Sequence, residues 1–458
     1  MKRYHRASLA MAGKHTGRTI AAGVTAIAAA LSFAACASPA ANKQTATTST
    51  SAATQDPNAV LTVWVDSTRQ PMAEAYQKAH PDVKMKIETY DGNANGATTL
   101  QTKISLFNRS NSGWPDVVFS TQVAEMSWLT SKQYDFPLDL QAAGLSQETI
   151  DGFAKGALAP CTVDGKTVCL RNDMAMNVTW YDTKLFKQFG YTVPTTWEEY
   201  GELGKKLGTE HPGYIIGTVG DSWGGDSYLW PSQCPVNQAV GPMHVKINGT
   251  DPKCTRVVEM LDPLIKNKTI STDTVFSSSF AKKQADKVLM LVGPNWYGGA
   301  LFAKGAGIEK PAGEIGVGKP LVWADGTDTT GNVGGGLWIV SKHTQSTKNA
   351  LDFVTWVTTN EDNQGSAPGY PAYAPAAKVW LSKLLASKFY ANDPTEVFTA
   401  AAGSVWDGWA YTSYSTYTPW TDKVVNKLNS GGSLADAMPV FTTELTNKAK
   451  AAGYTVDQ

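Results

Sequence analysis

From residue 59 onward, short apolar runs alternate with segments of helical length, and this alternation restricts the possible folds more than any other feature of the chain. The run LTVWV at 61–65 has the composition of a buried strand and is followed by apolar residues at helical spacing. The segments VKMKIETY (83–90) and PDVVFS (115–120) continue the pattern. Strands separated by helices form βαβ units and parallel sheets, so an α/β fold is predicted.

A second series of strands and helices begins after residue 169. The segments YIIGTV (214–219), KVLMLVGP (287–294) and LWIV (337–340) have the composition of buried strands. Two α/β lobes account for this length better than one sheet does. Ligands bind at the carboxyl ends of the strands in such sheets. The side chains that follow the strands of the first lobe are therefore candidates for a cleft: Asp66, Ser67, Ser120 and Gln122.

The beginning of the chain differs from this pattern. Five Lys and Arg residues precede an apolar stretch at 20–35, and this order is typical of an export signal. The stretch is shorter than the about 20 residues that a membrane-spanning helix needs. Small residues followed by Cys36 resemble a bacterial lipoprotein signal, which predicts a signal peptide at 1–35 and a lipidated cysteine with a flexible linker at 36–58. The protein is then expected on the extracellular face of the cell membrane; an ordinary secretory signal is the alternative.

Four further cysteines are expected to form disulfides, because an even number in an exported protein favours pairing. They are Cys161, Cys169, Cys234 and Cys254. The first two flank TVDGKTV, in which Asp-Gly is a hairpin turn signal, so they can face each other across two short strands. The other two are then left to form a second bridge. A zinc site is disfavoured because no C-x-x-C pair or histidine cluster accompanies them, and we expect neither metal nor cofactor.

Two motifs typical of enzymes are outweighed by the residues around them. Gly220–Gly224 matches the G-x-S-x-G elbow of serine hydrolases, but Gly224-Gly225-Asp226 and then Pro231 oppose the regular helix that must follow the serine. Gly313–Lys319 resembles a phosphate loop, but Pro320 replaces the Ser or Thr that would bind magnesium. No particular pair of acids indicates a glycosidase. A protein without catalytic activity is predicted, with a cell-surface esterase or glycosidase as the alternative.

Aromatic residues indicate a possible ligand. The chain has 15 Trp and 17 Tyr, and several tryptophans lie in segments predicted as loops. Aromatic rings stack on the C–H face of a sugar, while carboxylates and amides bind its hydroxyls. Trp296 follows a predicted strand at its carboxyl end, so a ligand contact is predicted for it. Several tryptophans lie in predicted loops beside Gly, Asn, Asp or Pro, among them Trp114, Trp223, Trp230, Trp296, Trp409 and Trp420.

An ordered set of segments from residue 59 to the end resembles the extracellular solute-binding proteins of bacterial carbohydrate ABC transporters, of the maltose-binding-protein type. The segments are LTVWV, PDVVFS, AMNVTWYDTKLFKQFGYTVPTTWEEYGELGKKL, LVGPNW, GNVGGGLWIVSKHTQSTKNALDFVTWV and GYPAYAPAAKVW. The resemblance implies a two-lobed periplasmic-binding-protein fold with a ligand cleft between the lobes and three chain crossings. It places lobe 1 at 59–175 and 333–374, and lobe 2 at 176–332 and 375–458.

The resemblance also implies which residues contact the ligand. In related sugar binders an acidic residue often stands eight positions before the tyrosine of an LYYN-like motif; here the tyrosine is Tyr181 and the acidic residue is Asp173. Trp296 in GPNW is the expected stacking platform. Gly335 would let backbone amides approach the ligand closely. The other positions implied are Asp66, Asp116, Ser120, Gln122, Trp223, Asp226, Trp230 and Trp409.

The expected function is that of a binding component that captures a sugar or oligosaccharide by hinge closure and delivers it to an ABC permease. The same fold with a polyamine, metal chelate or peptide as ligand is an alternative. The chain has 40 Lys+Arg and 40 Asp+Glu, so nothing favours nucleic acid as a partner. Cleavage before Cys36 removes five basic and no acidic side chains, which leaves a formal charge of −5. We expect a mildly acidic monomer held at the membrane by its lipid.

Overall fold

The computed structural model describes residue 56, residues 59–94 and residues 97–458. The predicted export signal, Cys36 and nearly all of the linker lie outside the described residues. The described residues all belong to one compact unit, which contains the two lobes. No helix among the described residues is long and apolar enough to cross a membrane.

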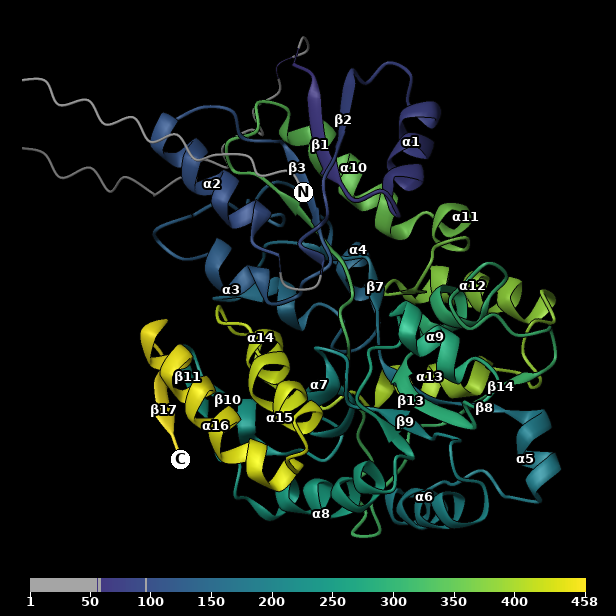
Figure 1. The fold of residues 1–458 in the computed structure, drawn as a ribbon. Coiled ribbons are helices and arrows are strands. Elements are labelled where there is room, and N and C mark those ends of the chain that lie inside the picture. The colour runs from purple at the N-terminus through teal and green to yellow at the C-terminus, as the bar shows by residue number, and fades with distance from the viewer. Residues whose placement is uncertain (1–55, 57–58, 95–96) are drawn as a thin grey trace, which may run out of the picture. The chain divides into compact units, whose positions relative to one another are not determined.

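Lobe 1 is built on a sheet that has five strands in the described part of the chain, in the order β2-β1-β3-β15-β6. β1 runs parallel to β2 and β3, whereas β15 is antiparallel to β3 and β6, so the sheet is mixed and not wholly parallel as expected. Helices lie beside it in the upper half of Figure 1. The strands are β1 (Leu61–Val65), β2 (Met85–Thr89), β3 (Val117–Ser120), β6 (Leu170–Arg171) and β15 (Leu337–Val340); the helices are α1 (Gln70–Ala79), α2 (Thr99–Ser110), α3 (Glu125–Leu129), α4 (Gln147–Asp151), α10 (Thr347–Thr359) and α11 (Glu361–Gln364).

Lobe 2 contains several small sheets instead of one large sheet. β8 lies between β13 and β14, β9 pairs with β12, and β11 lies between β10 and β17. The strands are β8 (Asn177–Asp182), β9 (Gly217–Thr218), β10 (Gln238–Gly241), β11 (His244–Lys246), β12 (Ile270–Ser271), β13 (Met290–Pro294), β14 (Ile315–Gly318) and β17 (Thr455–Asp457). The helices are α5 (Thr183–Phe189), α6 (Trp197–Glu210), α7 (Gly224–Tyr228), α8 (Pro252–Lys266), α9 (Ser278–Gln284), α12 (Ala374–Ala386), α13 (Thr395–Gly403), α14 (Tyr417–Pro419), α15 (Asn426–Asn429) and α16 (Leu434–Ala451).

Segments that connect the two lobes lie side by side. β7 (Asp173–Met174) is antiparallel to β16 (Tyr370–Pro371). On the other side of this connection, the backbone N–H of Val333 donates to the carbonyl oxygen of Ala175 at 2.8 Å. The chain therefore passes between the lobes along a ribbon whose segments are hydrogen-bonded to one another.

The first turn of α6 shows how local sequence fixes an element of lobe 2. Thr196 accepts a hydrogen bond from the backbone N–H of Glu199, and the Glu199 carboxylate accepts one from the Thr196 N–H, which forms a capping box. One face of the helix is buried in the core of lobe 2. Its apolar residues recur at helical spacing: Trp197, Tyr200, Leu203 and Leu207.

Both expected disulfides are present. Cys161 and Cys169 join the ends of a hairpin, with their Cα atoms 4.9 Å apart. Cys234 is bonded to Cys254 in α8, with a Cα separation of 4.6 Å. The second bridge fixes α8 to the segment that follows α7. The hairpin strands are β4 (Thr162–Val163) and β5 (Lys166–Thr167).

The two motifs typical of enzymes have different local structures. The phosphate-loop-like segment forms strand β14. After Ser222 the chain forms the short helix α7, although we expected Gly224 and Gly225 to oppose a helix there. Gly224 fits because the ring of Trp420 packs against it: an added Cβ would lie 2.5 Å from Trp420 Nε1.

Candidate functional site

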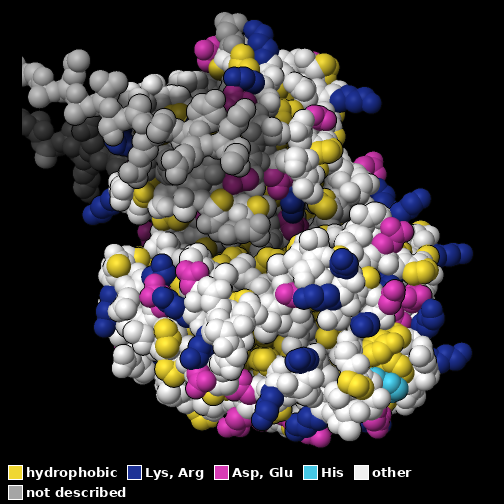
Figure 2. Space-filling model, in the orientation of Figure 1, with side chains coloured by type: hydrophobic (Ala, Val, Ile, Leu, Met, Phe, Trp, Pro, Cys, Tyr) yellow, Lys and Arg dark blue, Asp and Glu magenta, His cyan; other side chains and the backbone are white. Residues whose placement is uncertain are grey.

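A cavity of about 180 Å³ lies between the two lobes. Figure 2 shows the surface hollowed along the boundary between the upper and lower lobes. Because both lobes line the cavity, a molecule bound there touches both of them. Lobe 1 contributes Asn93, Gln101, Gln122, Glu125 and Trp128; lobe 2 contributes Asp226, Trp230, Asn237 and residues 409–417; the connecting segment contributes Asn332 and Gly334.

Two stacked tryptophans line the cavity on the lobe 2 side. The rings of Trp230 and Trp409 are stacked, with centroids 5.1 Å apart and planes 11° from parallel. The ring of Tyr411 meets Trp230 edge-on at 6.0 Å. Trp230 is held in place because its Nε1–H donates to the carbonyl oxygen of Trp406 at 2.8 Å. The cavity therefore has a fixed apolar surface to which a flat molecule can bind.

The loop at 411–417 is held over the cavity by Asn237. The amide of Asn237 donates to the carbonyl oxygen of Ala410 at 2.9 Å, and its Oδ1 accepts from the Tyr414 hydroxyl at 3.0 Å. Asn237 is buried, so both polar ends of its amide are used within the protein. The loop is thus fixed at its beginning and at its middle.

Two buried carboxyl groups line the cavity from opposite lobes. On lobe 1, Glu125 Oε2 accepts from Asn93 Nδ2 at 3.0 Å. Burial raises the pKa of Glu125 to about 8, against the opposing effect of hydrogen bonds from Asn93 and Trp128. On lobe 2, Asp226 Oδ2 accepts from the Tyr417 hydroxyl at 3.0 Å, and burial raises the pKa of Asp226 to about 7.

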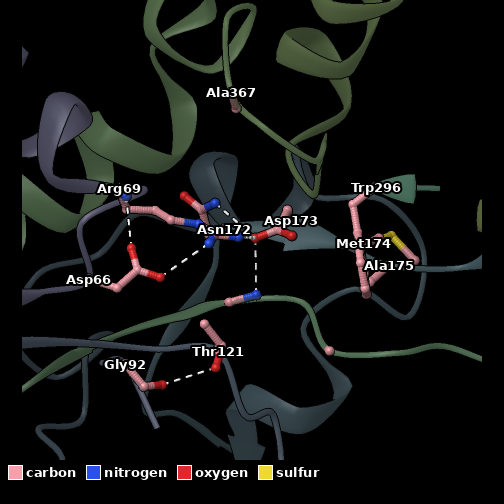
Figure 3. A network of polar contacts seen from close by, with 12 residues as sticks. Asp66, Arg69, Gly92, Thr121, Asn172, Asp173, Met174, Ala175, Trp296 and Ala367 are labelled. Carbon is pink, nitrogen blue, oxygen red and sulfur yellow. Dashed lines mark hydrogen bonds and ion pairs between the residues drawn. The ribbon is translucent and has the colours of Figure 1, made fainter. Parts of the chain in front are cut away.

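Asp66 and Asp173, both expected to contact a ligand, instead form an ionic network with Arg69 (Figure 3). Arg69 Nη1 lies 3.1 Å from Asp66 Oδ2, and Arg69 Nη2 lies 3.8 Å from Asp173 Oδ1. Asp173 Oδ1 also accepts from the Gly336 N–H at 3.0 Å and from Asn172 Nδ2 at 2.9 Å. These carboxylates already have partners within the protein, and they connect the start of α1 to the segments between the lobes.

Asp116 and Ser120 are not part of the cavity. Asp116 precedes β3 at its amino end, where its carboxylate accepts from the Thr62 N–H at 2.7 Å and the Thr344 hydroxyl at 2.6 Å. Asp116, a predicted ligand contact, thus lies at the strand end opposite to the one that ligands approach in such sheets. Ser120 lies at that opposite end but is fully buried, and its Oγ accepts from the Gln122 N–H at 3.1 Å.

Gly335 is needed for packing within the protein, which differs from the expected role in approaching a ligand. Its φ angle is +95°, and a Cβ there would lie 2.6 Å from the carbonyl oxygen of Asp173 and 2.8 Å from Arg171 Nη2. The preceding Gly334, with φ at +86°, is the glycine that lines the cavity. Both positions favour glycine because their φ angles are positive.

Trp296 and Trp223 belong to a separate aromatic cluster. Trp296 is half-buried and lies near Met174 and Ala175 in Figure 3; its Nε1–H donates to the carbonyl oxygen of Val333 at 3.0 Å. Phe276 is 46% exposed, and its ring is nearly parallel to that of Trp296 at 5.9 Å. Neither tryptophan lines the described cavity. This aromatic cluster is adjacent to the cavity, because Val333, which accepts the hydrogen bond from Trp296, lies between the cavity residues Asn332 and Gly334.

Of the eleven positions proposed as ligand contacts, the cavity includes Gln122, Asp226, Trp230 and Trp409. It also contains residues that sequence reasoning missed, above all Glu125 and the loop at 411–417. One signal was available in the loop: YTSYSTY has a tyrosine at every third position with Ser and Thr between them. Tyrosine combined with small hydroxyl residues is typical of binding loops.

Comparison of the sequence with known families identifies one family. The profile of the family described as bacterial extracellular solute-binding protein matches residues 61–364. No curated protein matches the chain in sequence.

Solved structures at low identity share the architecture. The chain is similar to the galacto-N-biose-/lacto-N-biose I-binding protein of the ABC transporter from Bifidobacterium longum, in complex with lacto-N-biose (TM-score 0.71, 19% identity, 88% of this chain and 100% of that one). It is similar to the GacH receptor of Streptomyces glaucescens (TM-score 0.65, 20% identity, 85% and 98% covered) and to maltose-bound MalE3 of T. maritima (TM-score 0.65, 18% identity, 85% and 100% covered). These likenesses show the two-lobed fold.

Proposed function

Because the chain belongs to the bacterial extracellular solute-binding proteins, we propose that it is the substrate-binding component of an ABC importer and captures a sugar or an oligosaccharide. The observation that carries this proposal is the cavity between the lobes, which the stacked Trp230 and Trp409 line beside amide and hydroxyl groups. An aromatic face packs on the C–H face of a sugar, and the polar groups bind its hydroxyls. The lacto-N-biose and maltose complexes of similar proteins support the same ligand class.

Capture is proposed to proceed by closure of the lobes. The ligand contacts both lobes only in the closed form, so its differential binding shifts the population toward that form. The hinge would be the connecting segments near Ala175, Val333 and Ala374, which pair with or lie next to one another. In this scheme lobe 1 comprises 59–175 and 333–374, and lobe 2 comprises 176–332 and 375–458.

The receptor is further proposed to act at the cell surface without catalysis. Lipidation of Cys36 would anchor the chain, and a linker of 22 residues spans roughly 25 Å on average. The folded part would stay within reach of the membrane while free to rotate. It would then bind its ligand as a monomer and pass it to the permease subunits.

Calorimetry against a panel of mono- and oligosaccharides tests this function. We expect saturable binding to at least one sugar and no cleavage of any glycosidic bond during the titration. Trp409→Ala should weaken that binding by about 1–3 kcal/mol, the range known for stacking on nucleobases. The matched control is Trp114→Ala, because Trp114 stacks on His343 and does not line the cavity. Sugar turnover, or equal affinity of a folded Trp409→Ala variant, would contradict the proposal.

A further inference from the structure

The charged groups of the cavity are all of one sign. Glu125 and Asp226 line it, and no Lys, Arg or His lines it among the described residues. Glu125 comes from α3 of lobe 1 and Asp226 from α7 of lobe 2. Their side chains are buried, with 8% and 5% of the residue surface exposed. The cavity wall therefore has two buried carboxyl groups and, among the described residues, no basic side chain; the buried Arg171 lies behind this wall, with Nη2 bonded to Asn332 Oδ1 at 3.3 Å.

Other buried carboxylates in this chain are compensated. Asp182 forms an ion pair with the buried Lys310 at 2.9 Å, and Asp66 forms one with Arg69 at 3.1 Å. Asp221 has no cation partner among the described residues, but its carboxylate accepts three hydrogen bonds. The donors are the Thr274 hydroxyl at 2.5 Å, the Val275 N–H at 3.1 Å and the Tyr297 hydroxyl at 3.4 Å. Ion pairing or multiple hydrogen bonds are the usual conditions for burying a carboxylate.

Asp226 lacks both kinds of compensation. Its Oδ2 accepts from the Tyr417 hydroxyl at 3.0 Å, and no donor among the described residues bonds to its Oδ1. Glu125 has only neutral donors, Asn93 and Trp128. Asp226 Oδ1, a carboxylate oxygen without a donor from the described residues at the wall of the cavity, is a group that a ligand can satisfy.

The surrounding rings favour a cation at the same place. Trp128 lines the lobe 1 side, and Trp230, Trp409, Tyr411 and Tyr417 line the lobe 2 side. Aromatic faces attract ammonium groups, and this attraction is strongest where water is excluded. A neutral sugar would use the rings for stacking but would leave both carboxyl groups without a cation.

On the basis of the proposed function, we propose that the ligand is a sugar that carries a positively charged amino group, which Glu125 and Asp226 bind from opposite lobes. The folded protein buries both carboxyl groups, and burying them in ionised form without a cation is unfavourable. A cationic ligand removes that cost, so the charge of the ligand itself favours the closed form.

The test is calorimetry with matched sugars that differ only at the nitrogen. The probes are glucosamine, galactosamine and β-1,4-linked glucosamine oligomers of two to four units, each compared with its N-acetylated and its hydroxyl counterpart. We expect a free-amine sugar to bind at least tenfold more tightly than both counterparts. Glu125→Gln and Asp226→Asn keep the shape of the side chains but remove the charge, so each should reduce this preference at least fivefold. Glu202→Gln, at an exposed position on α6, is the control that should keep it.

The outcomes separate this inference from the proposed function. If a neutral or acetylated sugar binds as tightly as its free-amine counterpart or more tightly, the amine inference is overturned and the sugar receptor stands. If the amine preference survives in both folded amide variants, the assignment to Glu125 and Asp226 is overturned. If no sugar of this panel or of the wider calorimetric panel binds, both proposals fall. Wild-type protein alone decides the first point, so a variant that does not fold leaves that comparison intact.

Discussion

Replacing Asp226 by asparagine should stabilise the ligand-free protein at alkaline pH, even though Asp226 lines the cavity. Burial raises the pKa of Asp226 from 3.8 to about 7, and the hydrogen bond from Tyr417 opposes this only in part. In the unfolded chain the carboxyl group loses its proton near its ordinary pKa. Between these two values the unfolded state binds fewer protons than the folded state, so stability falls as pH rises and then levels off above pH 7.

The size of the effect follows from the two pKa values. A difference of one pH unit corresponds to about 1.4 kcal/mol, so the ionised Asp226 costs the folded state about 4 kcal/mol at pH 8. Below the ordinary pKa of the carboxyl group the cost disappears. Asparagine keeps an oxygen that accepts from the Tyr417 hydroxyl but never ionises. The stability advantage of Asp226→Asn should therefore grow by about 3 kcal/mol between pH 5 and pH 8.

Urea unfolding of both proteins at pH 5, 6, 7 and 8 measures this difference directly. Glu202→Gln is the control, because its exposed carboxyl group should give a difference that changes little with pH. A constant difference between wild type and Asp226→Asn across this range would refute the burial argument. Destabilisation by Asp226→Asn at pH 8 would refute it as well.

Three further variants test contacts elsewhere in the structure. Lys310→Met leaves Asp182 buried without its cation and should lower the free energy of unfolding by about 3–5 kcal/mol in urea titrations; a loss below 1 kcal/mol would contradict the burial of this pair. Gly335→Ala places a Cβ 2.6 Å from a carbonyl oxygen at a positive φ angle and should lower the melting temperature in calorimetry; an unchanged melting temperature would count against the close packing there. Replacing Cys234 and Cys254 together by alanine opens a loop with a sequence separation of 20 residues and should lower the free energy of unfolding in urea by about 3 kcal/mol. If this double variant were as stable as the oxidised wild type, the bridge would be contradicted.

Much of the fold was accessible from the sequence because buried strands have a local signature. The runs at 61–65, 115–120 and 337–340 contain the three central strands of the lobe 1 sheet. Their relative direction was not accessible, since β15 returns from lobe 2 and enters the sheet antiparallel to β3. Which way a distant strand runs depends on the connection between the lobes and not on the residues of the strand.

The candidate site was only partly accessible for a similar reason. Asp66 and Asp173 follow or precede strands as ligand residues do, but Arg69 lies close enough to pair with both. Glu125 could not be predicted, because nothing in its local sequence shows that Asn93, 32 positions away in the chain, bonds to it. Whether a carboxylate faces a ligand or an internal partner is decided by contacts between segments that are far apart in the chain.

The most direct test of the central claim is the crystal structure of the protein with the sugar that calorimetry selects. The account predicts a closed form in which the sugar lies between the lobes, against Trp230 and Trp409 on one side and beside Gln122 and Glu125 on the other. A sugar bound to one lobe alone, or outside the cavity between the lobes, would contradict it.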